Sequence, residues 1–428
     1  MKKLHLLPAL FLAFCLWSCT DKCEETRTYR RYVPVAIALA DLRQSIKTLD
    51  IRSLINPGKI YVKDNYLFIN EVKQGIHVFD NSNPASPRAI SFIKISGNTD
   101  IAVKGNILYA DNYTDIVALN ISNPLNIKEV GRVEIAFMSG VIDGGYWSYN
   151  AQNNSIFDQQ YEYVTETVKS KVSCEDGNPI WGNWQSVSGG INFATSTSSS
   201  ASAPTTTGQA GSMARFALYD NYLYTVSQSS LQLFDIKSLE KPIKGKTINM
   251  GWGIETIFPY KDKLFIGSTT GMFIYDNKNP EAPTQLSVFQ HAMSCDPVVV
   301  NDNRAYVTLR SGTTCNRGLN QLDIIDITNL RNPTLIKSYP MQNPHGLGID
   351  FPNVFLCEGK QGLKSLDVRS DFDVKQLQHL TGMDAYDVIL LKNNVLLMIG
   401  KDGLYQYDYS NAGQLKLLST IPVKRLNI

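Results

Sequence analysis

The sequence predicts an all-β fold, a β-propeller of seven four-stranded blades with one large insertion. The main observation is a short apolar strand that recurs along the chain, and four of the six gaps between its central residues are 41 residues long. The other gaps, of 115 and 50 residues, equal this period plus an insertion. A period near 41 with four strands per unit is typical of propeller blades. The central residues are Leu67, Leu108, Leu223, Leu264, Ala305, Phe355 and Leu396.

The third strand of each unit has the clearest pattern. It ends in an acidic or amide residue followed by a polar, Pro-containing turn, as in GIHVFDNSNPASP at residues 75–87. An Asp or Asn at a strand end can accept a hydrogen bond from the backbone two residues on and so begin a turn. Because these residues recur once per unit, they lie on a ring and do not converge on a catalytic or calcium site. They are Asp80, Asn120, Asp235, Asp276, Asp326, Asp367 and Asp408.

This pattern, apolar and aromatic residues and then Asp and Ser/Asn-Pro, resembles the LVIVD-repeat β-propeller lipoprotein family. Five copies match well, and they begin at Gly75, Ile116, Leu231, Met272 and Leu322. The resemblance covers roughly residues 56–425 without the large insertion. It implies a propeller fold and an exported, surface-lipoprotein setting, and it implies no particular activity.

We predict that the propeller occupies residues 33–428 with an insertion at 136–212. A strand-like segment at 46–51 resembles an outer strand, although residues 415–423 already supply the outer strand of the last repeat. The extra strand therefore either closes the ring or belongs to an eighth, partial blade. The predicted repeats lie near residues 56–95, 96–135, 213–250, 252–290, 293–340, 343–382 and 384–425.

The N-terminus predicts export and lipid anchoring. Lys2 and Lys3 precede an apolar run that ends at Trp17, which is the length of a signal-peptide core and too short to span a bilayer. Residues 16–19, Leu-Trp-Ser-Cys, resemble the lipobox of bacterial lipoproteins, although Trp17 departs from the usual small or aliphatic residue. We therefore predict a signal peptide at 1–18 and lipidation of Cys19; the alternative is an ordinary cleaved signal with an incidental cysteine.

The predicted acylation of Cys19 holds the mature chain to a membrane without spanning it. Residues 19–32 are charged and poor in apolar side chains, and we interpret them as a tether. Once the signal peptide is removed, basic and acidic residues balance, so no electrostatic argument favours nucleic acid as a partner. We expect a membrane-anchored lipoprotein in the envelope of a Gram-negative bacterium, at its outer membrane, with a protein or glycan partner whose identity the sequence leaves open.

The cysteines favour one disulfide. Cys295 begins the first strand of the fifth repeat, and Cys315 follows the end of the adjacent antiparallel strand, so Cα atoms about 5–6 Å apart are feasible. An exported protein permits such a bond, and the alternative is two free thiols. We expect no metal site, because the cysteines and histidines lack zinc-ligand spacing.

The insertion has two parts with different compositions. The first is aromatic, and residues 161–171 alternate and are rich in Val and Thr, which predicts a strand. Trp181 and Trp184 form the kind of aromatic pair that stacks on sugar rings, whereas the plainer interpretation of this part is a small local core over a blade edge. The second part, residues 185–213, is rich in Ser, Thr and Gly and predicts a flexible loop.

No enzymatic motif is present, and no residue is assigned as catalytic. The chain lacks the GxSxG, P-loop, HExxH and dinucleotide-binding patterns, and we expect no cofactor. His77 lies in the middle of a third strand and is expected to face solvent. Two functions remain: a lipid-anchored interaction or ligand-binding scaffold, or an envelope carbohydrate-active enzyme such as a lyase or glycosidase.

The candidate ligand site lies at the mouth of the channel, where the loops enter the innermost strands. The residues there differ from one repeat to the next, whereas residues kept for the fold tend to repeat. They mix carboxylates, a histidine and aromatic rings, which suits a polyol, a cation or a peptide; the alternatives are a solvated polar rim or a site in the aromatic insertion. The candidates are Asp100, Trp252, Glu255, Asp296, His345, Asp384, Tyr386 and Asp387, with Thr99 and Cys295 beside them.

Overall fold

The computed structural model describes residues 24–169, 212–291, 297–311 and 319–424. The predicted signal peptide, Cys19, Trp181 and Trp184, most of the Ser/Thr/Gly-rich loop, and Cys295, Asp296 and Cys315 lie outside these residues. The chain divides into two compact units. The larger comprises Val35–Asp158 and Gly189–Asn427, and the smaller is built from Met1–Pro34 and Gln159–Ser188.

Each of the seven predicted repeats forms one sheet. The first repeat gives the order β2-β6-β5-β4-β3, and the second gives β10-β9-β8-β7. The strands are β2 (Lys47–Leu49), β3 (Pro57–Lys63), β4 (Tyr66–Glu71), β5 (Gly75–Asp80), β6 (Arg88–Lys94), β7 (Ile101–Lys104), β8 (Ile107–Asn112), β9 (Asp115–Asn120) and β10 (Lys128–Val133).

The five later repeats form four-stranded sheets in which strands pair in chain order, from the innermost to the outermost. Three of them contain β14 (Phe216–Tyr219), β15 (Tyr222–Val226), β16 (Ser230–Asp235), β17 (Ile243–Asn249), β18 (Ile254–Tyr260), β19 (Lys263–Ser268), β20 (Gly271–Asp276), β21 (Thr284–Gln290), β22 (Val298–Asn301), β23 (Arg304–Leu309), β24 (Gln321–Asp326) and β25 (Thr334–Pro340). The last two contain β26 (Leu347–Asp350), β27 (Asn353–Cys357), β28 (Leu363–Asp367), β29 (Lys375–Leu380), β30 (Ala385–Leu391), β31 (Val395–Gly400), β32 (Gly403–Asp408) and β33 (Lys416–Pro422).

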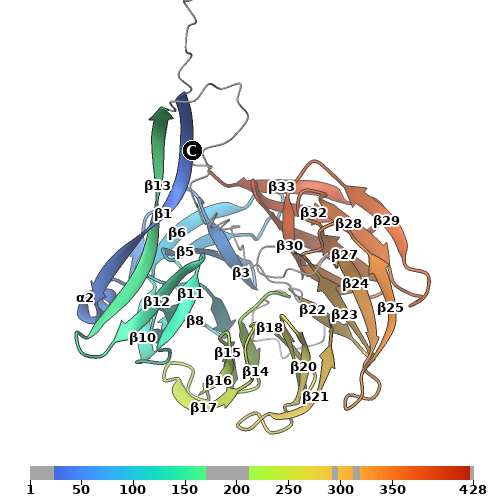
Figure 1. Cartoon of the computed structure of the whole chain (residues 1–428), viewed down its shortest axis with the longest axis horizontal. Coiled ribbons are helices and arrows are strands. Elements are labelled where there is room, and N and C mark those ends of the chain that lie inside the picture. The colour runs from blue at the N-terminus through green and yellow to red at the C-terminus, as the bar shows by residue number, and fades with distance from the viewer. Residues whose placement is uncertain (1–23, 170–211, 292–296, 312–318, 425–428) are drawn as a thin grey trace, which may run out of the picture. The chain divides into compact units, whose positions relative to one another are not determined.

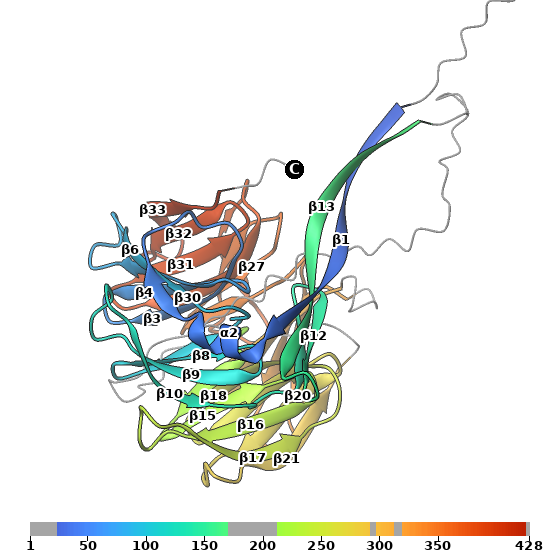
Figure 2. The same cartoon turned by 90° about the vertical axis from the view of Figure 1, so that its left-hand side faces the viewer.

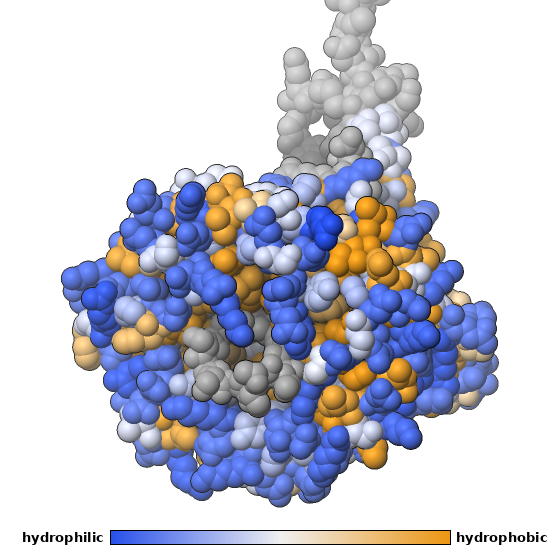
Figure 3. Space-filling view, turned by 180° about the vertical axis from the view of Figure 1, so that it is seen from behind, coloured by the Kyte–Doolittle hydropathy of each residue, from blue (hydrophilic) through white to orange (hydrophobic). Residues whose placement is uncertain are grey.

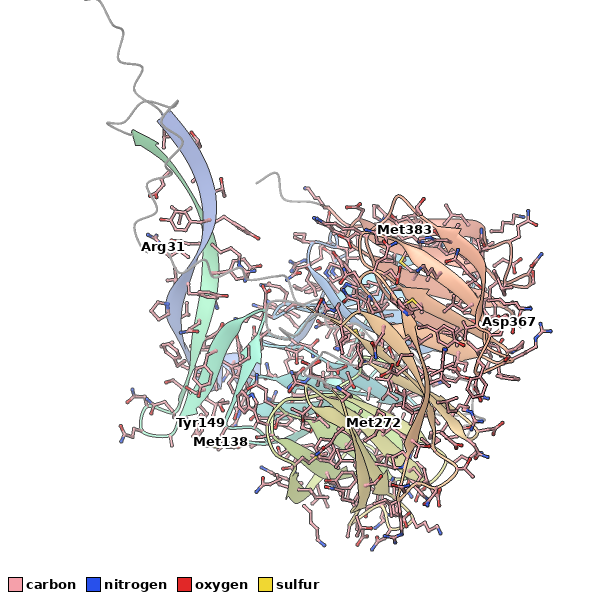
Figure 4. All side chains as sticks on the ribbon, turned by 45° about the vertical axis from the view of Figure 1, so that its right-hand side comes forward. Arg31, Met138, Tyr149, Met272, Asp367 and Met383 are labelled. Atoms are coloured by element: carbon pink, nitrogen blue, oxygen red, sulfur yellow. The ribbon has the colours of Figure 1, made fainter. Side chains whose placement is uncertain are left out.

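The predicted all-β fold and its repeat are confirmed. The seven central residues that define the 41-residue period are all fully buried. Each of the seven strand-end residues accepts a hydrogen bond from the backbone N–H two residues later, for example Ser82 N to Asp80 Oδ1 at 2.9 Å and Ser410 N to Asp408 Oδ1 at 2.8 Å. Asp367, labelled in Figure 4, makes the same turn. These residues therefore have the turn-forming role that their periodic spacing predicted.

The sheets of the larger unit lie around a common centre, with their innermost strands facing it (Figure 1). The innermost strands contact one another in the order β3, β7, β14, β18, β22, β26 and β30. Buried apolar clusters join successive sheets, and one of them joins the last sheet back to the first through Leu397, Ile399, Ile60 and Ile69. Each fully buried Leu or Ile side chain of this kind contributes about 1.5–3 kcal/mol.

An eighth sheet, in the order β1-β13-β12-β11, comes from the insertion and the N-terminal segment. Its strands are β1 (Glu24–Ala38), β11 (Ser139–Ile142), β12 (Gly145–Asn150) and β13 (Ser155–Lys169), and the described residues contain one helix, α2 (Leu39–Gln44). The strand predicted at 161–171 is present as far as Lys169, within β13, and residues 170 and 171 lie outside the described residues. In the larger unit, Trp147 and Ile156 pack with Leu39, Leu42 and Tyr113 in a small core.

The smaller unit contains a long antiparallel ribbon made by β1 and β13 (Figure 2). Residues 19–32 are predicted to be a tether, but from Glu24 onward they belong to strand β1. Cross-strand contacts explain the difference: Thr28 Oγ1 lies 2.8 Å from Thr165 Oγ1, and the Arg30 guanidinium lies over the Tyr161 ring at 3.7 Å. Arg31, labelled in Figure 4, donates to Glu162. Arg30 and Arg31 are therefore compatible with a strand here, because both have cross-strand partners.

Two further expectations differ from the structure. The extra strand β2 neither closes the last sheet nor begins an eighth repeat; it pairs with β6 as the outermost strand of the first sheet. His77 does not face solvent: it is buried, and its Nε2 lies 2.9 Å from Glu71 Oε2. Glu71 also accepts from the backbone of Ile55 and Asn56, so this pair fixes the segment that enters the first sheet.

Contacts between the last and first sheets are hydrogen bonded as well as apolar. Asn81 and Gln406 exchange two amide hydrogen bonds, of 2.9 and 2.7 Å, and both side chains are buried. The backbone of Leu54 forms a bridge with Val423 and accepts from Lys424 N at 2.7 Å. The N-terminal segment is therefore joined to the final strand across the seam between these two sheets.

We expect Asn81→Ala to lower the free energy of unfolding by about 1–3 kcal/mol, because the buried Gln406 amide loses both of its bonds to Asn81 and keeps only the 3.3 Å bond from Nε2 to Ser419 Oγ. Gln406→Leu should cost a similar amount. The double variant should cost less than the sum of the two, since no unpaired amide then remains. Urea unfolding of the four proteins tests this, and strictly additive losses would contradict the pairing.

Candidate functional site

Charged side chains from several sheets converge near the centre of the larger unit. Lys59 on β3, Asp100 before β7, Glu255 on β18 and Asp387 on β30 interact electrostatically, and Arg215 joins them from the segment before β14. We name these five residues the central polar cluster. Lys59, Asp100 and Asp387 are at most 3% exposed, so their charges need partners inside the protein.

Residues at the end of the insertion form many of the hydrogen bonds to these buried charges. Residues 212–216, named here the bridging segment, contact the innermost part of several sheets. Lys59 Nζ donates to the Met213 carbonyl, and Asp100 Oδ2 accepts from the backbone of Arg215 at 2.7 Å and of Phe216 at 3.2 Å. Ser212 Oγ donates to Asp387 Oδ1 at 3.4 Å.

Two further hydrogen bonds hold the bridging segment. The Ala214 carbonyl accepts from Ile257 N at 2.8 Å, and Ser212 Oγ accepts from Leu347 N at 3.3 Å. The flexible loop predicted at 185–213 therefore ends in ordered residues, because buried carboxylates and a buried lysine bind the backbone and hydroxyl groups there.

Burial shifts the pKa values of Lys59, Asp100 and Glu255 toward neutrality. It lowers the pKa of Lys59 to about 8 and raises that of Asp100 to about 6, in each case against the attraction between the two residues. Burial also raises the pKa of Glu255 to about 7, although Arg310 and Arg215 favour its ionised form. Perturbed groups gathered in this way are typical of functional sites, and buried ion networks that only stabilise a fold show the same shifts.

His345 lies beside this cluster and is held on several sides. Its backbone donates to the Cys357 carbonyl at 2.7 Å and accepts from Thr308 Oγ1 at 2.7 Å. The ring lies 5.6 Å from that of Tyr386, edge to face, and Nε2 lies 3.2 Å from Asn343 Nδ2. Burial and the positive charge of Arg310 lower the pKa of His345 to about 3, so the imidazole is neutral at physiological pH.

The predicted site residues thus separate into groups. Asp100, Asp387 and Glu255 are brought together, and His345 and Tyr386 contact each other. Asp384 lies at the entrance of β30, where its carbonyl accepts from Lys401 N at 2.9 Å. Trp252 lines a separate pocket, and Asp296 lies outside the described residues. Four residues of this region were not predicted from the sequence, namely Lys59, Arg215, Ser212 and Arg310. Only Lys59 could have been recognised, because it is a charged residue at the start of an apolar innermost strand.

A pocket of about 190 Å³ lies beside the central polar cluster. We name it the Trp252 pocket. Its lining comes from two regions that were predicted as alternative ligand sites, namely the loops at the mouth of the channel and the aromatic insertion. Its lining consists of Thr99, Asp111, Tyr113, Phe137, residues 139–142, Tyr146, Trp147, Arg215, Phe216, residues 226–229 and Trp252.

The backbone fixes the loop that carries Trp252 while leaving the indole in solvent. The side chain is 74% exposed and lies between Gly251 and Gly253, both with a φ of 91°. This region favours glycine, and a Cβ on Gly253 would also lie 2.1 Å from Thr269 Oγ1. Gly253 and Ile254 donate to the Gln228 carbonyl at 2.8 and 3.1 Å.

Asp158 fixes the opposite wall of the pocket. This fully buried carboxylate accepts from Lys73 Nζ and from the Tyr113 hydroxyl, each at 2.8 Å, and so joins β13 to the first and second sheets. Trp147 then packs against Gly140 and edge to face on Tyr113, with ring centroids 5.5 Å apart. Tyr146, on the same strand, is 44% exposed. The wall therefore has a packed indole and an exposed phenol.

The same hairpin is closed by backbone bonds. Met138 and Tyr149, labelled in Figure 4, are joined by a 2.8 Å bond from Tyr149 N to the Met138 carbonyl. Apolar side chains are interspersed with polar ones over the face shown in Figure 3. Among the described residues, no group of three His, Cys, Asp or Glu side chains has metal-binding geometry, and no helix is long and apolar enough to cross a membrane.

The repeat and the ring of sheets define a β-propeller, and comparison with known proteins identifies the repeat. The family described as the LVIVD repeat matches residues 57–92, 96–135 and 316–340. The chain thus contains LVIVD repeats within a β-propeller fold, and the predicted resemblance is confirmed. A search among curated proteins finds no match.

Ika8 and a Lactobacillus plantarum protein share the fold at low sequence identity. The computationally designed protein Ika8 is 11% identical, with a TM-score of 0.50 over 89% of this chain and 92% of its own. A protein from Lactobacillus plantarum is also 11% identical, with a TM-score of 0.50 over 89% of this chain and 97% of its own. BamB from Moraxella catarrhalis is 8% identical, with a TM-score of 0.47 over 88% and 97%.

We expect His345→Gln to change how stability depends on pH. The unfolded histidine gains a proton below about pH 6.5, whereas the folded one stays neutral down to about 3. The wild type therefore loses stability as the pH falls from 6.5, by up to about 1.4 kcal/mol per pH unit, and the variant lacks this contribution. Urea unfolding at pH 7, 6 and 5 measures the difference, with His379→Gln on β29 as the control. A difference between wild type and His345→Gln that does not vary with pH would contradict the assignment.

Proposed function

We propose that this protein is a lipid-anchored β-propeller of the cell envelope that binds a ligand in the Trp252 pocket. The observation that carries the ligand-binding part is the ordered presentation of an exposed indole. Placing a large apolar side chain in solvent on a glycine-flanked loop contributes nothing to the core, and tryptophan is among the residues that most often dominate binding energy. The lipid anchor rests on residues 16–19 and their resemblance to a lipobox.

We infer that seven of the eight sheets close into a seven-bladed ring and that the β1-β13-β12-β11 sheet is an insertion outside it. This inference is supported by the direct contact of β7 with β14, which leaves no place in the ring for the insertion sheet. The shared apolar cluster and the Asn81–Gln406 pair between the first and last sheets support the closure.

The pocket is a better ligand site than the centre of the ring. In the centre, the carboxylates of Asp100 and Asp387 already accept hydrogen bonds from the bridging segment. A ligand bound there would have to displace those partners from buried charges, which is costly. The Trp252 pocket needs no such exchange, because its exposed indole and phenol contact solvent.

Lipid anchoring should depend on Cys19 alone. We expect cells that express the wild type to incorporate a labelled fatty acid into this protein, and Cys19→Ala to abolish the label and release the protein from the membrane fraction. Cys23→Ala, four residues later, is the matched control and should be labelled like the wild type. Equal labelling of Cys19→Ala would contradict the lipobox interpretation.

Ligand binding should depend on Trp252. We expect arrays of oligosaccharides and peptides to contain ligands that the wild type binds and that Trp252→Ala loses at least about tenfold in affinity. The control is Phe372→Ala, because Phe372 is 72% exposed and lies in a turn far from the pocket lining. If no ligand distinguishes Trp252→Ala from Phe372→Ala, the pocket is not the binding site.

A further inference from the structure

We propose that the Trp252 pocket binds one uronic-acid unit of an acidic polysaccharide, with the sugar ring against the indole of Trp252 and the carboxylate on the guanidinium of Arg215. The proposal rests on the ligand-binding function proposed above and names the ligand class. Neither the repeat family nor the fold assigns this site. Three features of the pocket carry the argument: its size, its cation and its polar lining.

The size selects a single ring. A volume of about 190 Å³ is below the roughly 300–1,000 Å³ of pockets that enclose drug-sized ligands. The pocket therefore holds one ring-sized group, and the rest of a larger ligand remains outside. Trp252 and Tyr146 both line this space and are both exposed, so a flat apolar ring face can lie against them.

Among the described residues of the lining, Arg215 is the only cation, and its position leaves donors for a ligand. Its Nε donates to the Val226 carbonyl at 3.3 Å, and its terminal nitrogens make no hydrogen bond to the other described residues. The guanidinium can therefore bind a carboxylate through two parallel hydrogen bonds. The backbone N–H of Arg215 donates to the buried Asp100, which fixes the residue from which the guanidinium extends.

Asp111 is the only acidic side chain among the described residues of the lining, and its oxygens already accept hydrogen bonds from the protein. Asp111 Oδ1 accepts from Asn98 Nδ2 at 2.8 Å, from Thr99 N at 2.7 Å and from Asp100 N at 3.0 Å, and its Oδ2 accepts from the Thr99 hydroxyl. These bonds come from neutral donors, so they fill the acceptor positions of Asp111 without removing its charge, and the nearby Arg215 guanidinium attracts that charge. Because the guanidinium forms no hydrogen bond with Asp111, its terminal donors remain for a negatively charged ligand.

The remaining lining favours a polyol over a peptide. Ser139, Ser227, Gln228 and Ser229 add hydroxyl, amide and backbone groups around the two aromatic rings. Aromatic faces combined with short polar side chains suit a ring that carries many hydroxyl groups. An acidic peptide offers the carboxylate but neither the ring nor the hydroxyls, so we take the peptide as the competing outcome of the test.

The test uses the full-length protein in detergent and the trimers of galacturonic, glucuronic and mannuronic acid, with calorimetry as the measurement. We expect the wild type and Phe372→Ala to bind at least one trimer equally well. Trp252→Ala and Arg215→Gln should bind it at least about tenfold more weakly, and Arg215→Lys should recover part of the loss. The methyl ester of the same trimer keeps the ring and removes the charge. It should bind the wild type at least about tenfold more weakly than the free acid, while Arg215→Gln should no longer distinguish the two.

Several results would overturn the proposal. Equal affinity for the acid and its ester, or binding of neutral trimers or polyglutamate in preference to every uronate, would refute the ligand class while leaving a Trp252-dependent binding site. Uronate binding that survives both Trp252→Ala and Arg215→Gln would place the ligand elsewhere. Absence of binding to all three trimers by protein that melts like the wild type would refute this inference alone, whereas the array experiment decides the proposed function independently.

Discussion

The fold depends on one constraint, which is that none of the seven repeat sheets can bury its apolar faces alone. Each of these sheets has two faces, and the faces pack against the neighbouring sheets on either side. The seven residues at the repeat centres are fully buried because of this packing, and the apolar clusters always span neighbouring sheets. Stability is therefore a property of interfaces between repeats, as in other repeat proteins, and the seam between the last and first sheets matters as much as any other.

The same constraint creates the central polar cluster. Sheets that pack around a common centre bring their innermost strands together, so side chains far apart in sequence meet there without any local signal. Lys59 and Asp387 are separated by most of the chain, yet they interact. Buried charges of this kind are costly unless they are paired and hydrogen bonded, and removing one partner is strongly destabilising. The bridging segment meets this need, because it brings backbone groups and the Ser212 hydroxyl to the buried lysine and carboxylates.

The parts of the structure that the sequence predicts well are those that repeat. The strand centres, the turn residues from Asp80 to Asp408 and the repeat boundaries all appear several times, so each copy supports the others. The parts that it misses occur once. Residues 24–32 look like a charged tether because their partners in β13 are more than a hundred residues away. His77 looks exposed because strand alternation alone does not indicate that it contacts Glu71. Arg215 follows a low-complexity loop, so nothing local indicates that it reaches both the cluster and the pocket.

Positions that break the repeat are also where a function can be added without loss of the fold. The Trp252 loop occupies the place where every repeat enters its innermost strand, and its two glycines allow a backbone conformation that other residues rarely adopt. The insertion supplies the other wall, fixed through Asp158 to two sheets that it does not belong to. The exposed indole is not part of the core, because the repeat that carries Trp252 packs through Leu264 and Ile266. The pocket therefore exists only where a unique insertion meets a unique loop, and its ligand contacts can change while the repeated core stays the same.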